Sequence, residues 1–194
     1  MKSYNIPCVI FAGGKSKRMG RDKALLPFNG YDTLTEYQYE RLKPYFKETY
    51  ISCKNRKKFN FNANFIEDIE TKEHSPLIGF ISVFENIQND AFFALSVDAP
   101  FFNIKDFEKL YRYKDEDYDA LIAKEKNGKT HPLCGIYKRS ILPLFKEALS
   151  KKRHKIKDIL EKAKTLYIEF EEEKIFTNLN YPEDYQNAKR MLNG

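Results

Sequence analysis

The chain has 194 residues, of which 42% are hydrophobic and 32% charged, and its formal net charge at pH 7 is +6. This length fits one domain with a full core, spanning residues 1–194, and the composition is typical of a soluble globular protein. Every apolar run is far shorter than the ~20 residues of a membrane span, and the N-terminus leads directly into a predicted strand. We therefore expect a cytoplasmic protein with no membrane partner.

The three cysteines and the net positive charge exclude few classes of function. Cys8, Cys53 and Cys134 are widely spaced and form neither a disulfide framework nor a zinc pattern, so we expect reduced and mostly buried thiols. A net positive charge fits a polyanionic ligand, and it keeps an RNA-binding domain among the candidates.

Short apolar runs and turn signals predict the strands. The runs lie at residues 8–12, 50–53, 64–67, 91–97, 119–123, 133–137 and 166–170. Asn127-Gly128 predicts a hairpin between the fifth and the sixth of these strands. The last run alternates between apolar and polar residues, which is typical of an edge strand.

Capping patterns and helical periodicity predict the intervening helices. Thr33 with Glu36, and Asn103 with Asp106, have the spacing of a capping box at a helix start. Further helices are predicted at residues 56–61, 77–88, 140–149 and 156–163, and a last one beginning near residues 180–182. Alternating strands and helices predict a three-layer α/β domain with a mainly parallel sheet that includes an antiparallel hairpin or edge strand.

The first predicted strand leads into a glycine-rich basic loop with the sequence A-G-G-K-S-K-R-M-G-R-D-K. Gly13 and Gly14 would let backbone N–H groups approach a phosphate, Arg18 can donate to it as a fork, and Lys23 is a compact point charge. The loop is not a Walker A motif, because Val9 stands where that motif needs a glycine, and G-x-G-x-x-G is absent. We predict a phosphate-binding loop of another kind.

Two aspartates follow predicted strands. Asp98 ends the most apolar strand of the chain and suits Mg²⁺, which takes one or two carboxylates together with substrate phosphate oxygens; a turn role before Pro100 is the alternative. For Asp68, a turn role and a ligand contact are equally open. The carboxyl ends of parallel strands share one edge of a sheet, so the basic loop and both aspartates predict a single site there.

Other polar features have simpler explanations. The basic run at residues 151–155 is by default a solvated helix end, although it could receive a second anionic substrate. His131, which precedes Pro132, is expected to be structural. No Ser-His-Asp or Cys-His arrangement can be argued from order or spacing, so covalent catalysis is not favoured.

The loop F-A-G-G-K-S-K-R-M-G-R-D-K-A-L-L resembles the signature of the molybdenum cofactor guanylyltransferases, nucleotidyltransferases of the glycosyltransferase-A-like fold. The similarity continues in the family order at S-P-L-I-G-F-I-S-V, S-V-D-A-P-F, H-P-L-C-G-I-Y and F-T-N-L-N-Y-P-E-D-Y. It implies a Rossmann-like nucleotide-diphospho-sugar transferase fold. It also implies that the chain transfers GMP from GTP to molybdopterin, with Mg²⁺ as cofactor and pyrophosphate as the second product.

The resemblance further implies roles for individual residues. Arg18, Lys23 and Asp98 would be catalytic, with Asp98 as the Mg²⁺ ligand. The nucleotide would contact Phe11, Ala12, Gly13, Gly14, Lys23, Asp68, Pro76, Leu77, Gly79 and Asp98. The acceptor would contact Arg153, Lys155, Asn178 and Asn180. A protein that delivers the molybdenum cofactor is a candidate partner, and no nucleic acid is expected.

Two alternatives to this function remain open. The first is a related nucleotidyltransferase that uses CTP or a sugar 1-phosphate, which the double glycine and the C-terminal asparagines disfavour. The second is a non-catalytic basic RNA-binding domain, which would show salt-dependent RNA affinity and no Mg²⁺-dependent GTP binding. The family often has an asparagine after its second strand, whereas this chain has Ser52-Cys53-Lys54-Asn55 there.

Overall fold

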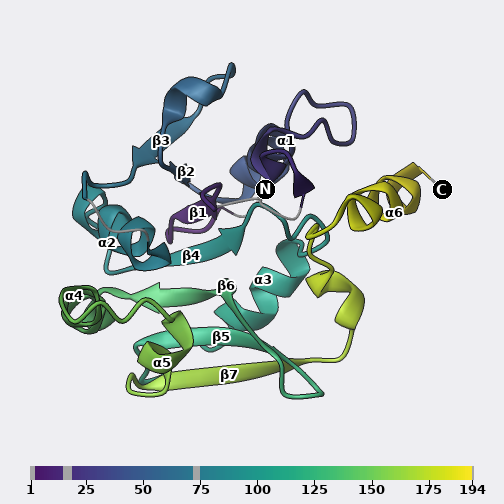
Figure 1. Ribbon diagram of the computed structural model, residues 1–194. Coiled ribbons are helices and arrows are strands. Elements are labelled where there is room, and N and C mark those ends of the chain that lie inside the picture. Colours follow the sequence, from purple (N-terminus) through teal and green to yellow (C-terminus); the bar gives the residue numbers. More distant parts are fainter. Residues whose placement is uncertain (1–2, 15–18, 72–74, 194) are drawn as a thin grey trace.

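A computed structural model describes residues 3–14, 19–71 and 75–193, which form a seven-stranded sheet with helices on both faces (Figure 1). The strand order is β3-β2-β1-β4-β6-β5-β7. The strands are β1 (Cys8–Phe11), β2 (Thr49–Cys53), β3 (Asn64–Glu67), β4 (Ala91–Ser96), β5 (Ala120–Glu125), β6 (Thr130–Lys138) and β7 (Thr165–Phe170). Each of the strands predicted from the sequence is present, with ends shifted by a few residues.

The first four strands form the parallel half of the sheet. β1 lies between β2 and β4 and pairs with both in parallel, while β3 pairs in parallel with β2. All four residues of β1 are buried, because helices cover both faces of a parallel sheet and leave no polar side. The register places Phe11 beside Ser52 on one side and Ser96 on the other, so three strands end together.

The remaining strands contain the predicted hairpin. β6 is antiparallel to both β4 and β5, and the hairpin turn uses Gly128 at φ +88°, a conformation that favours glycine. The antiparallel strand β6 therefore lies inside the sheet. The edge strand β7, predicted from its alternation, pairs with β5 in parallel.

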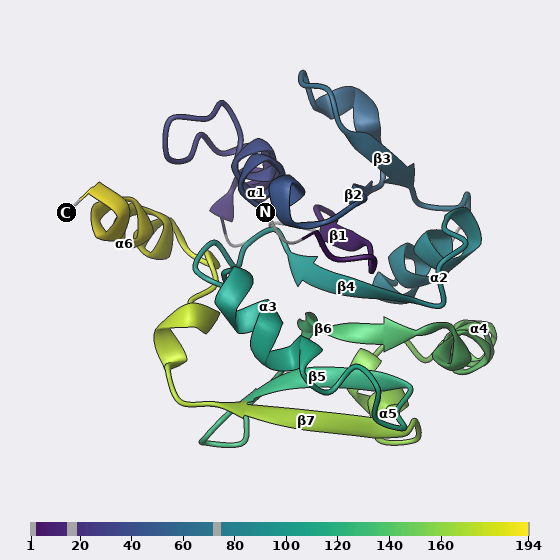
Figure 2. The ribbon, with the colours of Figure 1, turned by 180° about the vertical axis from the view of Figure 1, so that it is seen from behind.

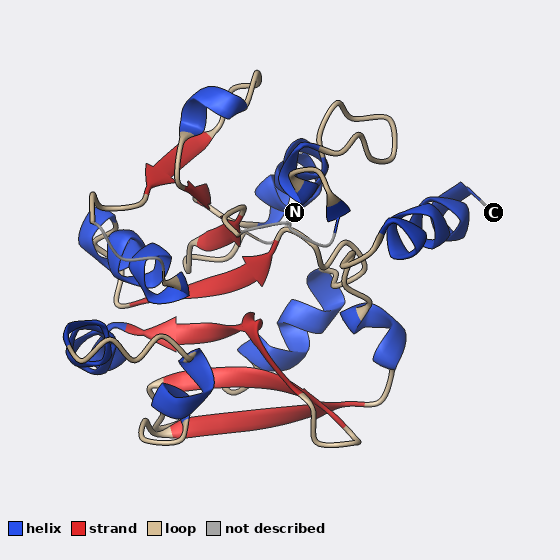
Figure 3. Ribbon diagram, in the orientation of Figure 1, coloured by secondary structure: helices blue, strands red, loops and turns tan. Residues whose placement is uncertain are grey.

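Helices cover the two faces of the sheet unequally, which confirms the predicted three-layer arrangement (Figures 2 and 3). The helices are α1 (Leu34–Leu42), α2 (Pro76–Asn86), α3 (Ile104–Tyr111), α4 (Leu142–Ser150), α5 (Ile156–Leu160) and α6 (Pro182–Asn193). One apolar cluster joins the sheet to α1 and α3, and a second joins it to α2, α4 and α5. α6 begins at the strand-end edge and extends away from the sheet (Figure 1).

The caps agree with the sequence at several helix starts. Thr33 Oγ1 accepts from Glu36 N at 3.0 Å, and Asn103 and Asp106 form a complete capping box. Ser75 caps α2 by accepting from Leu77 N at 3.2 Å.

The helix predicted at residues 56–61 is wrong. Only a 3₁₀ turn at Arg56–Lys58 forms, and the chain is extended at Phe59. The physical reason is aromatic packing: Phe59 and Phe61 both contact Phe65 of β3, with ring centroids 5.5 and 6.0 Å away. Residues two apart in sequence can share one neighbour in an extended chain but not on a helix surface. The helices predicted at 140–149 and 156–163 also differ, since α4 follows a 3₁₀ turn at Arg139–Ile141 and α5 ends at Leu160.

The three cysteines are free and buried, as expected from their spacing. Burial raises the pKa of the Cys53 thiol to about 11 and raises those of Cys8 and Cys134 further still. In the described part of the chain, no helix is both long and apolar enough to cross a membrane.

Gly135 of β6 allows the closest approach between strands, and we expect its replacement by alanine to destabilise the fold. A Cβ at this position would lie 2.6 Å from Leu121 O and 2.7 Å from Ile122 Cδ1, and the backbone oxygen cannot move without disturbing β5. Overpacking of this kind costs about 1–3 kcal/mol, measurable by urea unfolding. Gly13→Ala, with no atom within 4 Å of the added Cβ, is the control; equal loss in both variants would contradict the packing argument.

Candidate active site at the strand ends

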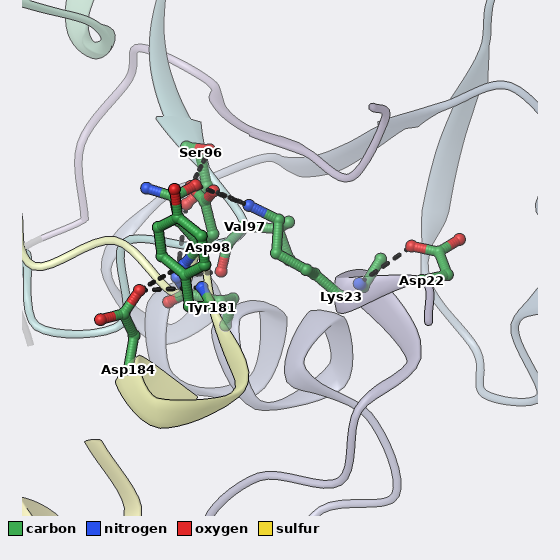
Figure 4. Close-up of polar contacts among 10 residues, drawn as sticks. Asp22, Lys23, Ser96, Val97, Asp98, Tyr181 and Asp184 are labelled. Carbon is green, nitrogen blue, oxygen red and sulfur yellow. Dashed lines mark hydrogen bonds and ion pairs between the residues drawn. The ribbon is translucent and has the colours of Figure 1, made fainter. Parts of the chain in front are cut away.

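Asp98 lies just beyond the end of β4, on the edge of the sheet that the sequence analysis predicted. Its side chain is 13% exposed, and Ser96 Oγ donates to its Oδ1 at 2.5 Å (Figure 4). Leu179 N, from a segment 81 residues further along the chain, donates to the Asp98 backbone oxygen at 3.1 Å. The carboxylate is therefore held by its own strand end and by the C-terminal segment.

Lys23 approaches the same carboxylate from the far end of the basic loop. Its Nζ lies 2.5 Å from Asp98 Oδ2 and donates to Asn180 Oδ1 at 3.2 Å (Figure 4). A 3₁₀ turn at Lys23–Leu25 sets its position, because Asp22 caps this turn and Thr35 Oγ1 donates to Ala24 O at 2.7 Å. We call Ser96, Asp98, Lys23 and Asn180 the Asp98 cluster.

Asn180 belongs to a strap, residues 177–180, that precedes α6. The backbone N–H groups of Asn180 and Tyr181 both donate to Asp184, at 3.0 and 2.8 Å, so the acidic first turn of α6 fixes the end of the strap (Figure 4). Asn178 is half-buried two residues before Asn180, and Leu179 between them is fully buried. The predicted acceptor residue Asn180 thus contacts Lys23 across 157 positions of sequence.

A cavity of about 270 Å³ opens beside the Asp98 cluster, at the ends of β1, β2 and β3 and the start of α2. We call it the α2 pocket. Its lining is Phe11, Gly13, Gly14, Ser52, Lys54, Asp68, Ser75, Pro76, Gly79 and Leu133. Because Phe11 pairs with both Ser52 and Ser96, the α2 pocket and the Asp98 cluster share one strand-end edge.

Glycines shape the α2 pocket in two ways. A Cβ on Gly79 would lie 3.2 Å from both Phe11 Cε1 and Ser52 Oγ, so glycine lets α2 pack closely on the sheet at the pocket wall. Gly14 has φ +135°, a conformation that favours glycine, and no atom of the described residues lies within 4 Å of a Cβ built there.

Charged groups surround this edge. Burial raises the pKa of the half-buried Asp68, and Lys54 opposes that shift. Lys58 Nζ pairs with Asp22 Oδ2 at 2.7 Å and donates to Ala12 O at 3.3 Å, so it ties the two flanks of the basic loop together.

Most of the residues predicted for the nucleotide lie at this edge. Phe11, Gly13, Gly14, Asp68, Pro76 and Gly79 line the α2 pocket, and Lys23 and Asp98 meet in the adjacent cluster. Ala12 is buried at the end of β1, with its backbone N donating to Ser52 O at 2.8 Å. The Leu77 side chain is fully buried in the core behind the pocket.

The other predicted residues are placed differently. Arg18 lies outside the residues that the structure describes. Arg153 is exposed and lines a separate hollow between α4 and α5, and Lys155 is exposed directly before α5. No contact that the structure defines joins this pair to the Asp98 cluster.

Sequence reasoning did not identify Ser52, Lys54, Lys58, Ser96 and Leu133 as parts of this edge. Ser96 is the second-last residue of the most apolar predicted strand, residues 91–97, so its position close to Asp98 was available from that prediction. Lys54 directly follows the second predicted strand, so its place at the strand end was available from that boundary. Lys58 lies where the helix prediction failed, so its position could not be predicted.

Comparisons with known proteins agree with this geometry. The fold matches the crystal structure of molybdopterin-guanine dinucleotide biosynthesis protein A from Archaeoglobus fulgidus with a TM-score of 0.84, covering 97% of this chain and 99% of that chain at 23% identity. The model of the MobA-like NTP transferase domain matches residues 8–166. The chain therefore contains a MobA-like NTP transferase domain, and it shares the fold of that crystal structure.

Curated relatives define the class more narrowly. The chain is 36% identical to the molybdenum cofactor guanylyltransferase of Campylobacter jejuni strain 81116, over 99% of this chain and 100% of the relative. It is 34% identical to the protein of the same name from Helicobacter pylori strain G27, over 97% and 94%. The chain belongs to the molybdenum cofactor guanylyltransferase family, which confirms the resemblance seen in its motifs.

Proposed function

We propose that this protein transfers GMP from GTP to the phosphate of molybdopterin, forming the guanine dinucleotide of the cofactor and releasing pyrophosphate. Family membership over the full chain supports this activity. The observation that carries the proposal is the meeting of Lys23, Asp98 and Asn180 beside the α2 pocket. A polyphosphate substrate needs a cation and a metal-binding carboxylate at one place, and the acceptor needs polar groups next to them.

The nucleoside of GTP would occupy the α2 pocket. Guanine presents an acceptor at O6 and donors at N1 and N2, and the pocket offers Lys54 as a donor and Asp68 as an acceptor. The backbone of residues 11–14 would lie along the nucleotide, with Gly14 providing an unobstructed approach for phosphate. The phosphates would then point from the pocket toward Lys23.

The residues of the Asp98 cluster fit Mg²⁺. Asp98 supplies a hard carboxylate, oriented by Ser96, and the described residues contain no group of three or more His, Cys, Asp or Glu that could hold a metal alone. This composition suits an ion that takes one protein carboxylate and completes its shell with phosphate oxygens and water. When bound, Mg²⁺ would neutralise charge on the triphosphate and on the departing pyrophosphate.

The chain's own residues would supply positioning and charge. An oxygen of the molybdopterin phosphate forms a bond to the α-phosphorus of GTP, and the bond from that phosphorus to the α–β bridging oxygen breaks. The acceptor phosphate is already ionised, so no general base is required. Lys23 and Arg18 would donate to the phosphates, while Asn178, Asn180, Arg153 and Lys155 would contact the acceptor.

A pyrophosphate-release assay tests the proposed function directly. Purified protein is supplied with Mg²⁺, molybdopterin and either GTP or CTP, with acceptor-free reactions as blanks. Release that requires both GTP and molybdopterin, with the dinucleotide identified by mass spectrometry, supports the proposal. Equal or greater release with CTP, or with a sugar 1-phosphate as acceptor, would replace it with the alternative nucleotidyltransferase.

We expect Lys54 to contribute to the choice of base. Lys54→Met should raise the Kd for GTP about tenfold, the low end for a hydrogen bond to a charged group at an exposed position. It should affect 2,6-diaminopurine riboside triphosphate much less, because that base lacks O6. Lys57→Met is the matched control, since Lys57 is exposed and lies outside the α2 pocket. Equal weakening of both nucleotides would assign Lys54 to general phosphate attraction.

A further inference from the structure

A buried polar pair lies at the turn end of the β5–β6 hairpin, outside the Asp98 cluster. His131 is 7% exposed and Glu125 is 4% exposed, and His131 Nε2 lies 2.7 Å from Glu125 Oε1. Glu125 also accepts from Asn127 Nδ2 at 2.8 Å and pairs with Lys129 Nζ at 3.0 Å. A buried carboxylate held by this many partners fixes the orientation of the imidazole that faces it.

The imidazole contacts the segment that leads to the strap. Its ring stacks on Phe176 with centroids 4.0 Å apart and an interplanar angle of 7°. Phe176 is 3% exposed, and Phe102 and Phe170 pack against it at 6.1 and 5.5 Å. Phe176 thus packs between His131 of the hairpin and the aromatic core, and the strap, residues 177–180, follows it directly.

The strap connects Phe176 to the Asp98 cluster. One residue separates Phe176 from Asn178, and Leu179 N then donates to Asp98 O at 3.1 Å. Asn180 follows, with its Oδ1 accepting from Lys23 Nζ. Only Thr177 lies between Phe176 and Asn178, so a displacement of Phe176 would shift Asn178 directly. It would also weaken the hydrogen bond of Leu179 N, on which the position of the next residue, Asn180, depends.

The pKa shifts of His131 and Glu125 favour a neutral imidazole hydrogen-bonded to a carboxylate, which keeps the ring in one orientation. Burial lowers the pKa of His131, and Lys129 and Lys157 act in the same direction, while Glu125 opposes them. For Glu125, burial raises the pKa, but hydrogen bonds from Lys129, Asn127 and His131 outweigh it and lower the pKa overall. A neutral imidazole facing a carboxylate is therefore the form at neutral pH, and it donates through Nε2–H.

We propose that His131 is a positioning residue for the acceptor: by stacking on Phe176 it holds the strap so that Asn178 and Asn180 face the molybdopterin phosphate. This inference rests on the proposed function for the identity of the acceptor. The contact that positions the strap is the stacking of His131 on Phe176, and Glu125 orients the imidazole ring for this contact.

Two substitutions at His131 separate the stack from the hydrogen bond. His131→Gln keeps a donor for Glu125 and loses the ring, so the KM for molybdopterin should rise about fivefold or more, with kcat and the Kd for Mg²⁺-GTP changed less than twofold. His131→Phe combined with Glu125→Gln keeps an aromatic ring on Phe176 and removes the buried charge. This double variant should restore the KM for molybdopterin to within about twofold of wild type.

A destabilised variant remote from the strap serves as the control. Phe107→Leu removes packing from a fully buried ring of α3 that contacts Phe46 and Phe93, and the rings of Phe93 and Phe102 lie between it and Phe176. At an equal loss of Tm it should leave the KM for molybdopterin unchanged. An unchanged KM in His131→Gln, or an equal rise in Phe107→Leu, would overturn the proposal.

A second readout does not depend on the reaction. The chain contains no tryptophan, and Tyr181, at the end of the strap, is 50% exposed, so Tyr181→Trp introduces a single fluorescent reporter. Adding His131→Gln should lower the fluorescence anisotropy of this reporter, whereas adding Phe107→Leu should not. If wild type fails to transfer GMP but the anisotropy falls, only the proposed function is lost. If wild type is active and the anisotropy is unchanged, the positioning role is lost.

Discussion

Replacing Asp98 with asparagine should lower kcat/KM for GMP transfer about 10³-fold, the upper range for removal of one preorganised electrostatic group from an active site. Asparagine retains the shape and can still accept from Ser96 Oγ, but it removes the negative charge that pairs with Lys23 and that would attract Mg²⁺. The measurement is steady-state turnover with GTP and molybdopterin across a range of Mg²⁺ concentrations.

The same variant should separate metal binding from nucleotide binding. In wild type, the GTP-induced rise in Tm should depend on Mg²⁺, because Asp98 would hold the ion that neutralises charge on the triphosphate. In Asp98→Asn, the rise should be small and nearly the same with and without Mg²⁺. Asp106→Asn is the control for a lost carboxylate, since Asp106 closes the capping box of α3 and lies outside the site. Wild-type turnover in Asp98→Asn would remove Asp98 from the proposed mechanism.

The strand-end edge could be predicted because the local signals were strong. β4 is an uninterrupted apolar run, so its end was well defined and Asp98 fell at the carboxyl edge. The glycine pair after β1 placed the basic loop at a strand end, and a mainly parallel sheet, predicted from the alternation of strands and helices, brings such ends to one edge. The parallel pairing of β1 with β4 in the structure agrees with this. The strand ends, and with them the edge that carries Asp98 and the basic loop, could thus be located from apolar runs and the glycine pair.

Contacts between distant segments could not be predicted in this way. The hydrogen bond from Lys23 to Asn180 depends on where the strap crosses the end of β4, and no local pattern encodes that crossing. The pairing of Lys58 with Asp22 depends on an extended segment that the sequence suggested to be helical. The burial of His131 depends on Phe176, which lies 45 residues further along the chain.

The position of β6 shows the same limit at the level of topology. Asn127-Gly128 predicted the hairpin, and the structure contains it. No local sequence pattern predicts which of the two hairpin strands pairs with β4. In the structure Gly135 of β6 pairs with Ile122 of β5 and with Ala94 of β4, so β6 lies between these two strands.

The Lys23–Asp98 ion pair leads to a second prediction: replacing Lys23 should lower turnover but tighten metal binding. Lys23→Met should lower kcat/KM about 10³-fold, because the variant loses a cation that would contact the phosphates as charge develops on them. Lys23 Nζ lies 2.5 Å from Oδ2 of the carboxylate that would hold the metal. Its removal should therefore tighten the binding of Mn²⁺, used as a paramagnetic probe for the Mg²⁺ site, about tenfold or more by titration.

These two effects distinguish a direct role of Lys23 from a general loss of structure, because a damaged site would weaken metal binding together with turnover. Lys58→Met is the matched control: Lys58 is also ion-paired at the strand-end edge, but with Asp22, so its loss should leave Mn²⁺ affinity unchanged. If Mn²⁺ affinity fell in Lys23→Met, or rose equally in Lys58→Met, Lys23 would not be competing with the metal for Asp98. Opposite changes in turnover and metal affinity, confined to Lys23→Met, are the result expected if Lys23 leaves Asp98 for the phosphates when Mg²⁺-GTP binds.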